Sequence, residues 1–326
     1  MPGILNISLD FELHWGRFDK VVLDGVNKRY FENTRSVFPR MVQLFKDYEV
    51  HVTWAIVGML YHRDAAGWRA LQPEQYPAYE QKKFSSYEWV KGNGLMEPAD
   101  PYHFAPDLIA LLEGVEGFEI STHTYSHYYC QEAGQTVAQF RNDLLLAKQV
   151  AAERGHQLRS LVFPRNQFNA NYLSVCAEMG IETVRSNPAC WYWDANRPES
   201  LAKKIFRTGD AYSNLLGPKV VPLHAINRSQ TPLQLPASRL YRAWTEKSAV
   251  LNRLKLQRIL NEMSYAARTG GYYHLWWHPH NFGWHPEECM EELKNILIHY
   301  KRLKKKYGFE SLTMLETKQK LVLADF

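Results

Sequence analysis

Two carboxylates near the start of the chain have the spacing of a catalytic pair. The segment SLDFELHWG holds Asp10 and Glu12 two residues apart at the end of an apolar run. Residues i and i+2 of an extended strand share a face, so both carboxylates can point into one opening. One could then act as a general base while the other binds a metal ion. An Asp-x-Glu pair is also common on protein surfaces, so this segment alone identifies no site.

Two histidines further along have the spacing of a metal-binding pair. The segment STHTYSHYY holds His123 and His127 four residues apart. In a helical turn this spacing places both imidazoles on one face, where they could bind one metal ion. No glutamate follows the first histidine, which excludes the helix motif of the zinc metalloproteases. The spacing also occurs by chance, so it too needs support from other segments.

An arginine and a histidine follow two other apolar runs. The segment FPRNQFN presents Arg165, and LWWHPHNFGWHP presents His278 directly after two tryptophans. An arginine can orient a carboxylate and keep its pKa low, and a histidine can act as a general acid. The structural alternatives are an ion pair for Arg165 and a buried, hydrogen-bonded imidazole for His278.

Several aromatic and histidine side chains close to these segments could contact a sugar, because tryptophan and tyrosine have broad apolar faces with a polar edge. The candidates are Tyr125, Trp276, Trp277, Trp284, His14 and His280. Core packing is the alternative for each aromatic side chain. Six other histidines are expected to play no part in the site: His51, His62, His103, His156, His274 and His299.

These polar segments must be positioned by the apolar and amphipathic stretches that alternate along the chain. We predict strands at about 4–9, 50–58, 117–122, 158–163, 181–186, 272–277 and 310–315. Helices are predicted at about 34–48, 105–114, 135–154, 170–179, 245–269 and 286–307. This alternation predicts an α/β fold of parallel strands with crossover helices. The number of units favours an irregular, closed or nearly closed (β/α) barrel of about seven parallel strands, formed by residues 1–326 as a single domain.

In such a barrel the reacting groups lie where the strands end, which is where each polar segment falls. Two long connections, at about 59–104 and 187–244, show no clear periodicity. Long loops in compact enzymes usually act as lids or binding walls. We therefore expect both connections to rim a substrate cleft.

The composition fits a soluble globular protein and excludes several other classes. Apolar residues make up 45% of the 326 residues, and the net charge of +5 is mild and spread along the chain. We therefore expect no nucleic-acid partner. The four cysteines form no C-x-x-C pair, which argues against a cysteine-bound zinc ion and a disulfide framework. With no basic leader and no span long enough for a bilayer, the expected location is cytoplasmic; the oligomeric state stays open.

Taken together, the four segments resemble the polysaccharide deacetylase family, the metal-dependent carbohydrate esterases that include chitin and peptidoglycan N-deacetylases. The strongest piece is His123-Thr124-Tyr125-Ser126-His127, and the resemblance runs from about residue 4 to about residue 312. In two places the chain departs from the family pattern. Its two acids are separated by Phe11, and Pro164 precedes Arg165 where the family usually has proline after the arginine. Residues 236–240, PASRL, more weakly resemble a substrate loop of some relatives.

The resemblance implies a role for each segment. Asp10 would be the base, oriented by Arg165, and His278 the general acid. One divalent ion, most plausibly zinc, would be held by Glu12, His123 and His127. The roles of Asp10 and Glu12 could be exchanged, and a backbone N–H near Tyr128 could help to bind the oxyanion.

The activity implied is removal of an N-acyl group, most plausibly N-acetyl, from a sugar or glycan precursor, such as an intermediate of O-antigen or capsule synthesis. Two alternatives remain open on the sequence. One is hydrolysis of another amide, such as a formyl group, a cyclic imide or a ureide. The other is a carbohydrate-binding protein that has lost turnover.

Overall fold

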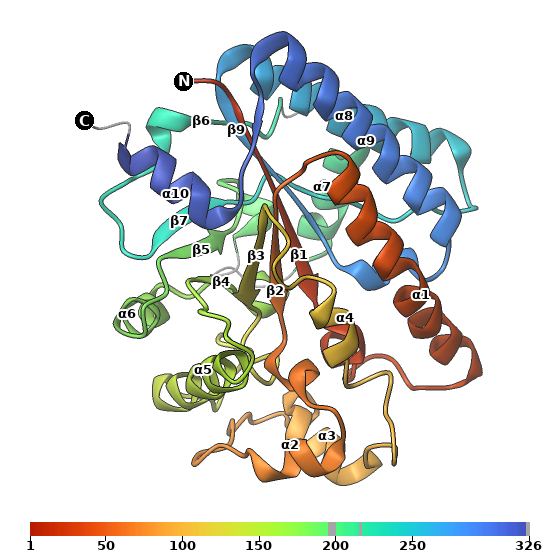
Figure 1. The fold of residues 1–326 in the computed structure, drawn as a ribbon, viewed down its shortest axis with the longest axis vertical. Helices are drawn as coiled ribbons and strands as arrows, with labels where there is room; N and C mark the ends of the chain where they lie inside the picture. Colours follow the sequence, from red (N-terminus) through yellow and green to blue (C-terminus); the bar gives the residue numbers. More distant parts are fainter. Residues whose placement is uncertain (195–199, 215–216, 324–326) are drawn as a thin grey trace.

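The computed structural model describes residues 1–194, 200–214 and 217–323, and its centre is a curled sheet surrounded by helices (Figure 1). Within these residues ten strands follow the order β6-β9-β1-β2-β3-β4-β5-β7, with β10 beside β1 and β8 beside β9. Every pair is parallel except β6 with β9. The predicted α/β fold with a nearly closed barrel is thus confirmed.

The strands range from two residues in β6, β8 and β10 to eight in β1. Their bounds are β1 (Ile4–Phe11), β2 (Val52–Ile56), β3 (Phe118–Thr122), β4 (Ser160–Val162), β5 (Thr183–Ser186), β6 (Val221–Pro222), β7 (Leu233–Pro236), β8 (Arg239–Leu240), β9 (Gly271–Trp277) and β10 (Glu310–Ser311).

One segment closes the barrel. Residues 233–240 form β7, which pairs with β5, and then β8, which pairs with β9. Between the two strands, Ala237 N donates to Ser186 O at 2.8 Å and Ser238 N donates to His274 O at 2.9 Å. The predicted substrate loop at 236–240 is therefore part of the closing strand. With β7 and β8 counted together, seven parallel positions surround the barrel in the described chain.

The strand predicted at 310–315 is largely wrong. Only Glu310 and Ser311 pair with β1, and Met314 already begins the last helix, α10 (Met314–Leu323). The closing segment at 233–240 supplies the ring position that residues 310–315 were expected to fill. Its strands are interrupted after Pro236, which hid their periodicity in the sequence.

Most of the helices lie around the outside of the sheet, whereas α2 and α3 lie beyond one end of the strands (Figure 1). Their bounds are α1 (Gly25–Asp47), α2 (Ala65–Ala70), α3 (Ser86–Asn93), α4 (Pro106–Ala110), α5 (Val137–Ala152), α6 (Leu173–Glu178), α7 (Leu201–Tyr212), α8 (Ala249–Thr269) and α9 (Pro286–Tyr307). The helix predicted at 34–48 begins earlier, because Asp24 acts as N-cap and accepts hydrogen bonds from Val26 N and Asn27 N. Four helices were not predicted, namely α2, α3, α7 and α10.

Strand β1 shows how the period of two sorts the side chains. Leu5, Ile7 and Leu9 pack in the main hydrophobic core. The alternate residues point into the barrel, where Ser8 and Asp10 contact Arg185 of β5, which is not a neighbour of β1 in the sheet. The barrel interior is therefore polar along this strand.

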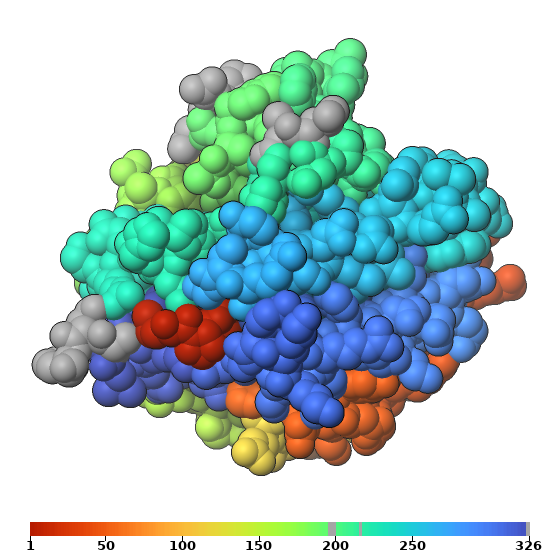
Figure 2. Space-filling view, turned by 90° about the horizontal axis from the view of Figure 1, so that it is seen from above, coloured from red at the N-terminus to blue at the C-terminus, as the bar shows by residue number. Residues whose placement is uncertain are grey.

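Helix α10 covers the amino-terminal end of the barrel. Its first turn donates from Met314 N to Thr53 Oγ1 at 2.9 Å, and Thr317 Oγ1 accepts from Asn6 Nδ2 at 2.8 Å. Figure 2 shows this end of the molecule, with the N-terminal residues in red between the cyan and blue segments. The carboxyl ends of the strands lie at the opposite end and carry the polar segments. Among the described residues, no helix has the length and apolar character needed to cross a bilayer.

Candidate functional site

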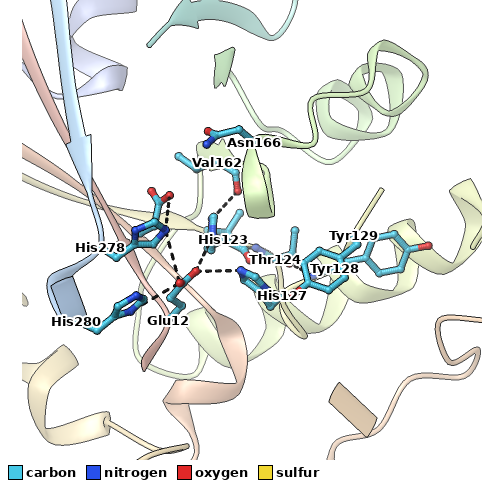
Figure 3. Close-up of polar contacts among 12 residues, drawn as sticks. Glu12, His123, Thr124, His127, Tyr128, Tyr129, Val162, Asn166, His278 and His280 are labelled. Atoms are coloured by element: carbon cyan, nitrogen blue, oxygen red, sulfur yellow. Dashed lines mark hydrogen bonds and ion pairs between the residues drawn. The ribbon is translucent and has the colours of Figure 1, made fainter. Parts of the chain in front are cut away.

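Glu12 lies among four imidazoles at the carboxyl ends of β1, β3 and β9 (Figure 3). Its Oε2 atom is 3.3 Å from His123 Nε2 and 3.0 Å from His127 Nε2. Its Oε1 atom is 3.6 Å from His278 Nε2 and 3.7 Å from His280 Nδ1. Burial raises the pKa of Glu12, but the imidazoles of His278, His127 and His123, through charge and hydrogen bonding together, hold it well below its usual value. Glu12 is therefore an ionised, buried carboxylate.

The two histidines of the STHTYSH segment meet in a loop, and the predicted helical turn is wrong. Strand β3 ends at Thr122, and Thr124 and His127 then have positive φ angles of 64° and 57°. A β-branched residue rarely adopts this conformation, and such strain is concentrated at functional sites. Tyr128 N donates to Thr124 Oγ1 at 2.7 Å and closes the loop. The N–H of Tyr128 itself is therefore used within the loop, and an oxyanion contact from a backbone N–H near Tyr128 stays a prediction.

A buried carboxylate on α5 binds this loop through hydrogen bonds. Asp143 Oδ1 accepts from Tyr125 N at 2.7 Å, and Asp143 Oδ2 accepts from Ser126 N at 3.1 Å. The Ser126 hydroxyl also donates to Asp143. Burial raises the pKa of Asp143 to about 6. The sequence analysis did not single out Asp143, because its only signal was an acid on the buried face of a helix.

Each histidine of the loop is oriented through its Nδ1 atom. His123 Nδ1 lies 2.8 Å from Val162 O, and a carbonyl can only accept, so Nδ1 carries a hydrogen and Nε2 is the ring atom that can bind a metal ion. His127 Nδ1 lies 3.0 Å from Tyr129 Oη. Burial lowers the pKa of His127 to about 4, so its ring is neutral near pH 7. Both Nε2 atoms face Glu12 (Figure 3).

These atoms fit a divalent metal ion. Glu12 Oε2 and His123 Nε2 are buried and have no hydrogen-bond partner, which is costly unless another group binds them. The ligand atoms of Glu12, His123 and His127 lie within 4.8 Å of one another. Two neutral imidazoles with one carboxylate and open positions are the donor set of a catalytic zinc site. His280 Nδ1 is a further buried atom without a partner, and it also faces Glu12.

The arginine that orients Asp10 is Arg185, and the contact predicted for Arg165 is wrong. Both Arg185 Nη atoms donate to the Asp10 carboxylate at 2.7 Å, and both side chains are buried. Burial raises the pKa of Asp10, but the charge and hydrogen bonds of Arg185, together with the His123 and His278 imidazoles, lower it below its usual value. Arg165 instead pairs with Asp19 and lies 4.3 Å from the Tyr129 ring centroid.

Arg165 and Arg185 differ in where the backbone places them. Arg165 lies in the turn after β4 with a φ of 54°, whereas Arg185 lies within β5 with its side chain inside the barrel. The sequence contained one signal for Arg185, a charged residue in the middle of the strand predicted at 181–186. A buried parallel strand has an arginine there only when the arginine is paired.

A continuous chain of hydrogen bonds runs from Arg185 through the barrel interior. Arg185 Nη1 donates to Ser8 Oγ at 3.0 Å, and Ser8 Oγ lies 2.8 Å from His274 Nε2. His274 Nδ1 lies 2.9 Å from Tyr272 Oη, which donates to Asn6 Oδ1 at 2.7 Å. Because Tyr272 donates its hydrogen to Asn6, its oxygen accepts from His274 Nδ1. His274 Nε2 then accepts from Ser8, so every hydrogen in the chain is assigned.

His278 extends over both carboxylates from the end of β9. Its Nε2 atom is 3.7 Å from Asp10 Oδ2 and 3.6 Å from Glu12 Oε1. Its Nδ1 atom lies 3.3 Å from Asn281 Oδ1, a distance that permits only a weak hydrogen bond. The side chain is 25% exposed, whereas Asp10 and Glu12 are almost fully buried. His278 is thus placed between the buried carboxylates and solvent.

Strand periodicity separates the two tryptophans before His278. Trp276 lines the cavity above the carboxylates and stacks on Arg185, whose Cζ atom is 4.3 Å from the ring centroid. Trp277 points the other way and packs in the main core, so its predicted substrate contact is wrong. His280 lines the cavity as predicted, whereas Trp284 is half exposed and lies outside it.

Two other predicted substrate contacts are also wrong. Tyr125 is fully buried, and its hydroxyl lies 2.7 Å from His62 Nε2. His14 is fully buried too, between His103 Nε2 at 2.8 Å and Val21 O at 2.8 Å. Both side chains stabilise the loops behind the site. Their proximity in sequence to Glu12 and His127 gave no information on which way they point.

The cavity above Asp10 and Glu12 has a volume of about 810 Å³, within the range of ligand pockets. The connection at 187–244 contributes to its wall, among others through Trp193 and Arg207, as predicted. The connection at 59–104 supplies none of the described lining residues, so that half of the prediction is wrong. It packs behind the histidine loop instead, where Tyr79 Oη accepts from Tyr129 N at 2.8 Å.

Barrel and site together define a class: an α/β-barrel protein with a carboxylate–histidine centre of the kind found in metal-dependent hydrolases. The comparison with family models identifies the family. The polysaccharide deacetylase model matches residues 18–184, just over half of the chain. The chain belongs to the polysaccharide deacetylase family. The matched region holds His123, His127 and Arg165 but begins after Asp10 and Glu12.

Solved structures share this fold at low sequence identity. A polysaccharide-deacetylase-like protein from Mycobacterium smegmatis has a TM-score of 0.59 and 12% identity, over 99% of this chain and 91% of the other. Another from Pseudomonas aeruginosa PAO1 has a TM-score of 0.55 and 13% identity, over 97% of this chain and 89% of the other. Puue allantoinase has a TM-score of 0.53 and 13% identity, over 97% of this chain and 89% of the other. These similarities show the fold alone. A comparison with curated proteins gave no match.

Proposed function

We propose that the protein is a metal-dependent hydrolase that removes an N-acyl group, here assigned as N-acetyl, from a sugar or glycan precursor. One observation carries this proposal. Glu12 and the imidazoles of His123 and His127 face one another directly beside Asp10, whose carboxylate is paired with Arg185. Membership of the polysaccharide deacetylase family supports the choice of an acylated sugar.

Glu12, His123 and His127 would hold the metal ion, and their imidazoles suit zinc. When bound, such an ion supplies Lewis-acid chemistry: it polarises the acyl oxygen and lowers the pKa of water to about 7. The protein's part is to fix the ligands. The Nδ1 contacts of both histidines with Val162 O and Tyr129 Oη set the orientation of each ring.

The remaining polar groups move protons. Asp10 accepts the proton of the attacking water, and Arg185 keeps its carboxylate ionised and fixed in orientation. His278, the exposed member of the cluster, donates a proton to the departing amine. The two roles are separated in space, because Asp10 is held inside the barrel and His278 reaches in from the cavity.

The test is acetate release from a panel of N-acetyl sugars, with and without a chelator, combined with metal analysis. We expect Glu12→Gln to lose both metal and activity. Asp10→Asn should keep the metal and lose activity. If Asp10→Asn loses metal while Glu12→Gln keeps it, the two roles are exchanged. A metal-loaded protein that releases acetate from none of the sugars would contradict the proposal.

As the cellular setting we propose the synthesis of a surface polysaccharide, such as an O-antigen or capsule, with a cytoplasmic precursor as substrate. Fractionation of cells that express the full chain tests the location. Accumulation of an acetylated glycan precursor in a deletion strain tests the pathway. A deletion that leaves all surface glycans unchanged would contradict this setting.

A further inference from the structure

The side chains that line the cavity above the candidate site are acidic at its floor and mostly basic at its rim. Two carboxylates, Asp10 and Glu12, line the floor and are matched by Arg185 and the imidazoles. Further out, the described residues that line the cavity include six basic side chains and one carboxylate, Asp194. The basic side chains are Arg17, Lys20, Arg165, Lys203, Lys204 and Arg207. The rim is therefore strongly cationic.

Among the described residues, three of these cations, Arg17, Lys20 and Lys204, have no hydrogen-bond or ion-pair partner for their side chains. Arg165 pairs with Asp19, and Lys203 Nζ donates to Asp194 O. In contrast, the side chains of Arg17 and Lys20 form no hydrogen bond or ion pair with any residue in the described ranges. Burial and repulsion from Arg165 lower the pKa of Lys20. Positive charge is thus concentrated on one wall beyond what the neighbouring acids neutralise.

The backbone places Arg17 directly beside the candidate metal ligands. Gly16 packs so closely on Glu12 that a Cβ atom there would lie 1.9 Å from the Glu12 carboxyl carbon. Arg17 follows in the same loop, and Lys20 one turn later through a hydrogen bond from Lys20 N to Arg17 O at 2.9 Å. Arg17 and Lys20 therefore line the same cavity as the carboxylate floor.

Aromatic faces also line the cavity. Trp193 and Trp276 lie with ring centroids 6.3 Å apart, and Arg207 Cζ is 5.3 Å from the centroid of Trp193. Aromatic rings offer the apolar faces on which a sugar ring can stack, while unpaired cations suit anionic oxygens. The cavity thus provides surfaces for both a sugar and a nearby negative charge.

We infer that Arg17 and Lys20 form an anion subsite, and that the substrate bears a phosphate or carboxylate group on or next to the acylated sugar. This inference rests on the proposed function for the position of the acyl group, since it places the anion beside the reacting sugar. A neutral substrate would leave these two cations at the cavity wall without counter-charge. An anionic sugar would bind both and gain charge-assisted hydrogen bonds.

Binding of simple probes tests the subsite without requiring turnover. Glucose, glucose 1-phosphate and glucuronate would be titrated by calorimetry into the full chain at fixed ionic strength. The test variant is Arg17→Gln/Lys20→Gln. The matched control is Arg253→Gln/Lys294→Gln, which removes the same net charge from exposed helix positions outside the cavity.

At least one anionic probe should bind more tightly than glucose, and the test variant should weaken it by about tenfold for each lost charge-assisted contact. The control variant should bind like the parent. Whether glucose 1-phosphate or glucuronate shows the effect identifies the anion. Equal binding of all three probes, or equal losses in both variants, would overturn the subsite. If an anionic probe binds as expected but no N-acetyl sugar releases acetate, the proposed function is wrong while the anion subsite is still supported.

Discussion

The pairing of Arg185 with Asp10 gives the sharpest quantitative prediction. Both side chains are buried, and two hydrogen bonds of 2.7 Å join them. Removing one partner of a buried ion pair leaves an uncompensated charge, which typically costs about 3–5 kcal/mol. Arg185→Met should therefore lower the free energy of unfolding by about this amount. Asp10→Asn should lower it as well, because Arg185 is then buried without its carboxylate.

The double variant Asp10→Asn/Arg185→Met removes both charges, so its loss should be clearly smaller than the sum of the single losses. Urea unfolding of all four proteins in the presence of a chelator gives the coupling energy without a contribution from bound metal. Activity should not return with stability, because the double variant lacks the base. Additive losses, or a loss below about 1 kcal/mol for Arg185→Met, would refute the pairing.

Arg165→Met is the matched control for this cycle. Arg165 pairs with Asp19 and is 21% exposed at its side chain, so its loss should resemble that of a partly exposed ion pair, about 1 kcal/mol or less. It should also show no coupling with Asp10→Asn. Strong coupling between Arg165 and Asp10 would restore the assignment made from the sequence and contradict the contact with Arg185.

Three further predictions concern positioning. Gly16→Ala should scarcely change the free energy of unfolding, but it should weaken metal binding because the new Cβ atom displaces the Glu12 carboxylate. A metal competition assay measures this effect. The control is Gly92→Ala, where the new Cβ atom meets no other atom within 4 Å. His274→Leu should lower kcat more than KM by disturbing Ser8 and Arg185, and His274→Gln, which keeps a donor and an acceptor, should recover part of the loss. Burial raises the folded-state pKa of Asp143 to about 6, above its unfolded value, so ionising it costs stability as pH rises. The stability of the parent relative to Asp143→Asn, measured by urea unfolding, should therefore fall between pH 4 and pH 7 by about 3 kcal/mol. A flat difference across this range would contradict the raised pKa.

The sequence predicted the barrel because alternating apolar and amphipathic stretches are a local property of the chain. It also predicted that Glu12, His123, His127, Asp10 and His278 occupy one end of the barrel, since each follows a strand. It failed where the direction of a side chain decides the outcome. Trp276 and Trp277 are neighbours of the same type, yet only one lines the cavity. Composition cannot tell them apart, because the answer depends on the register of β9.

The second kind of failure concerns contacts across the barrel. Arg185 was overlooked because Asp10, its partner, lies far away in sequence and on a strand that is not adjacent in the sheet. Such a pair leaves no periodic or spacing signal. Arg165 was predicted to orient Asp10 because it lies in a polar segment after a strand, where charged residues are common for many reasons.

The polar interior of the barrel explains why the correct arginine had to come from within a strand. A carboxylate buried as deeply as Asp10 stays ionised only if a cation is held against it, and a loop arginine could exchange that contact for water. Arg185 cannot leave easily, because Trp276 stacks on its guanidinium and Ser8 accepts one of its hydrogens. The hydroxyl of Ser8 is in turn fixed by His274. The base is therefore oriented by the rigid part of the fold, while His278, which must meet a changing substrate, extends from a strand end into the open cavity.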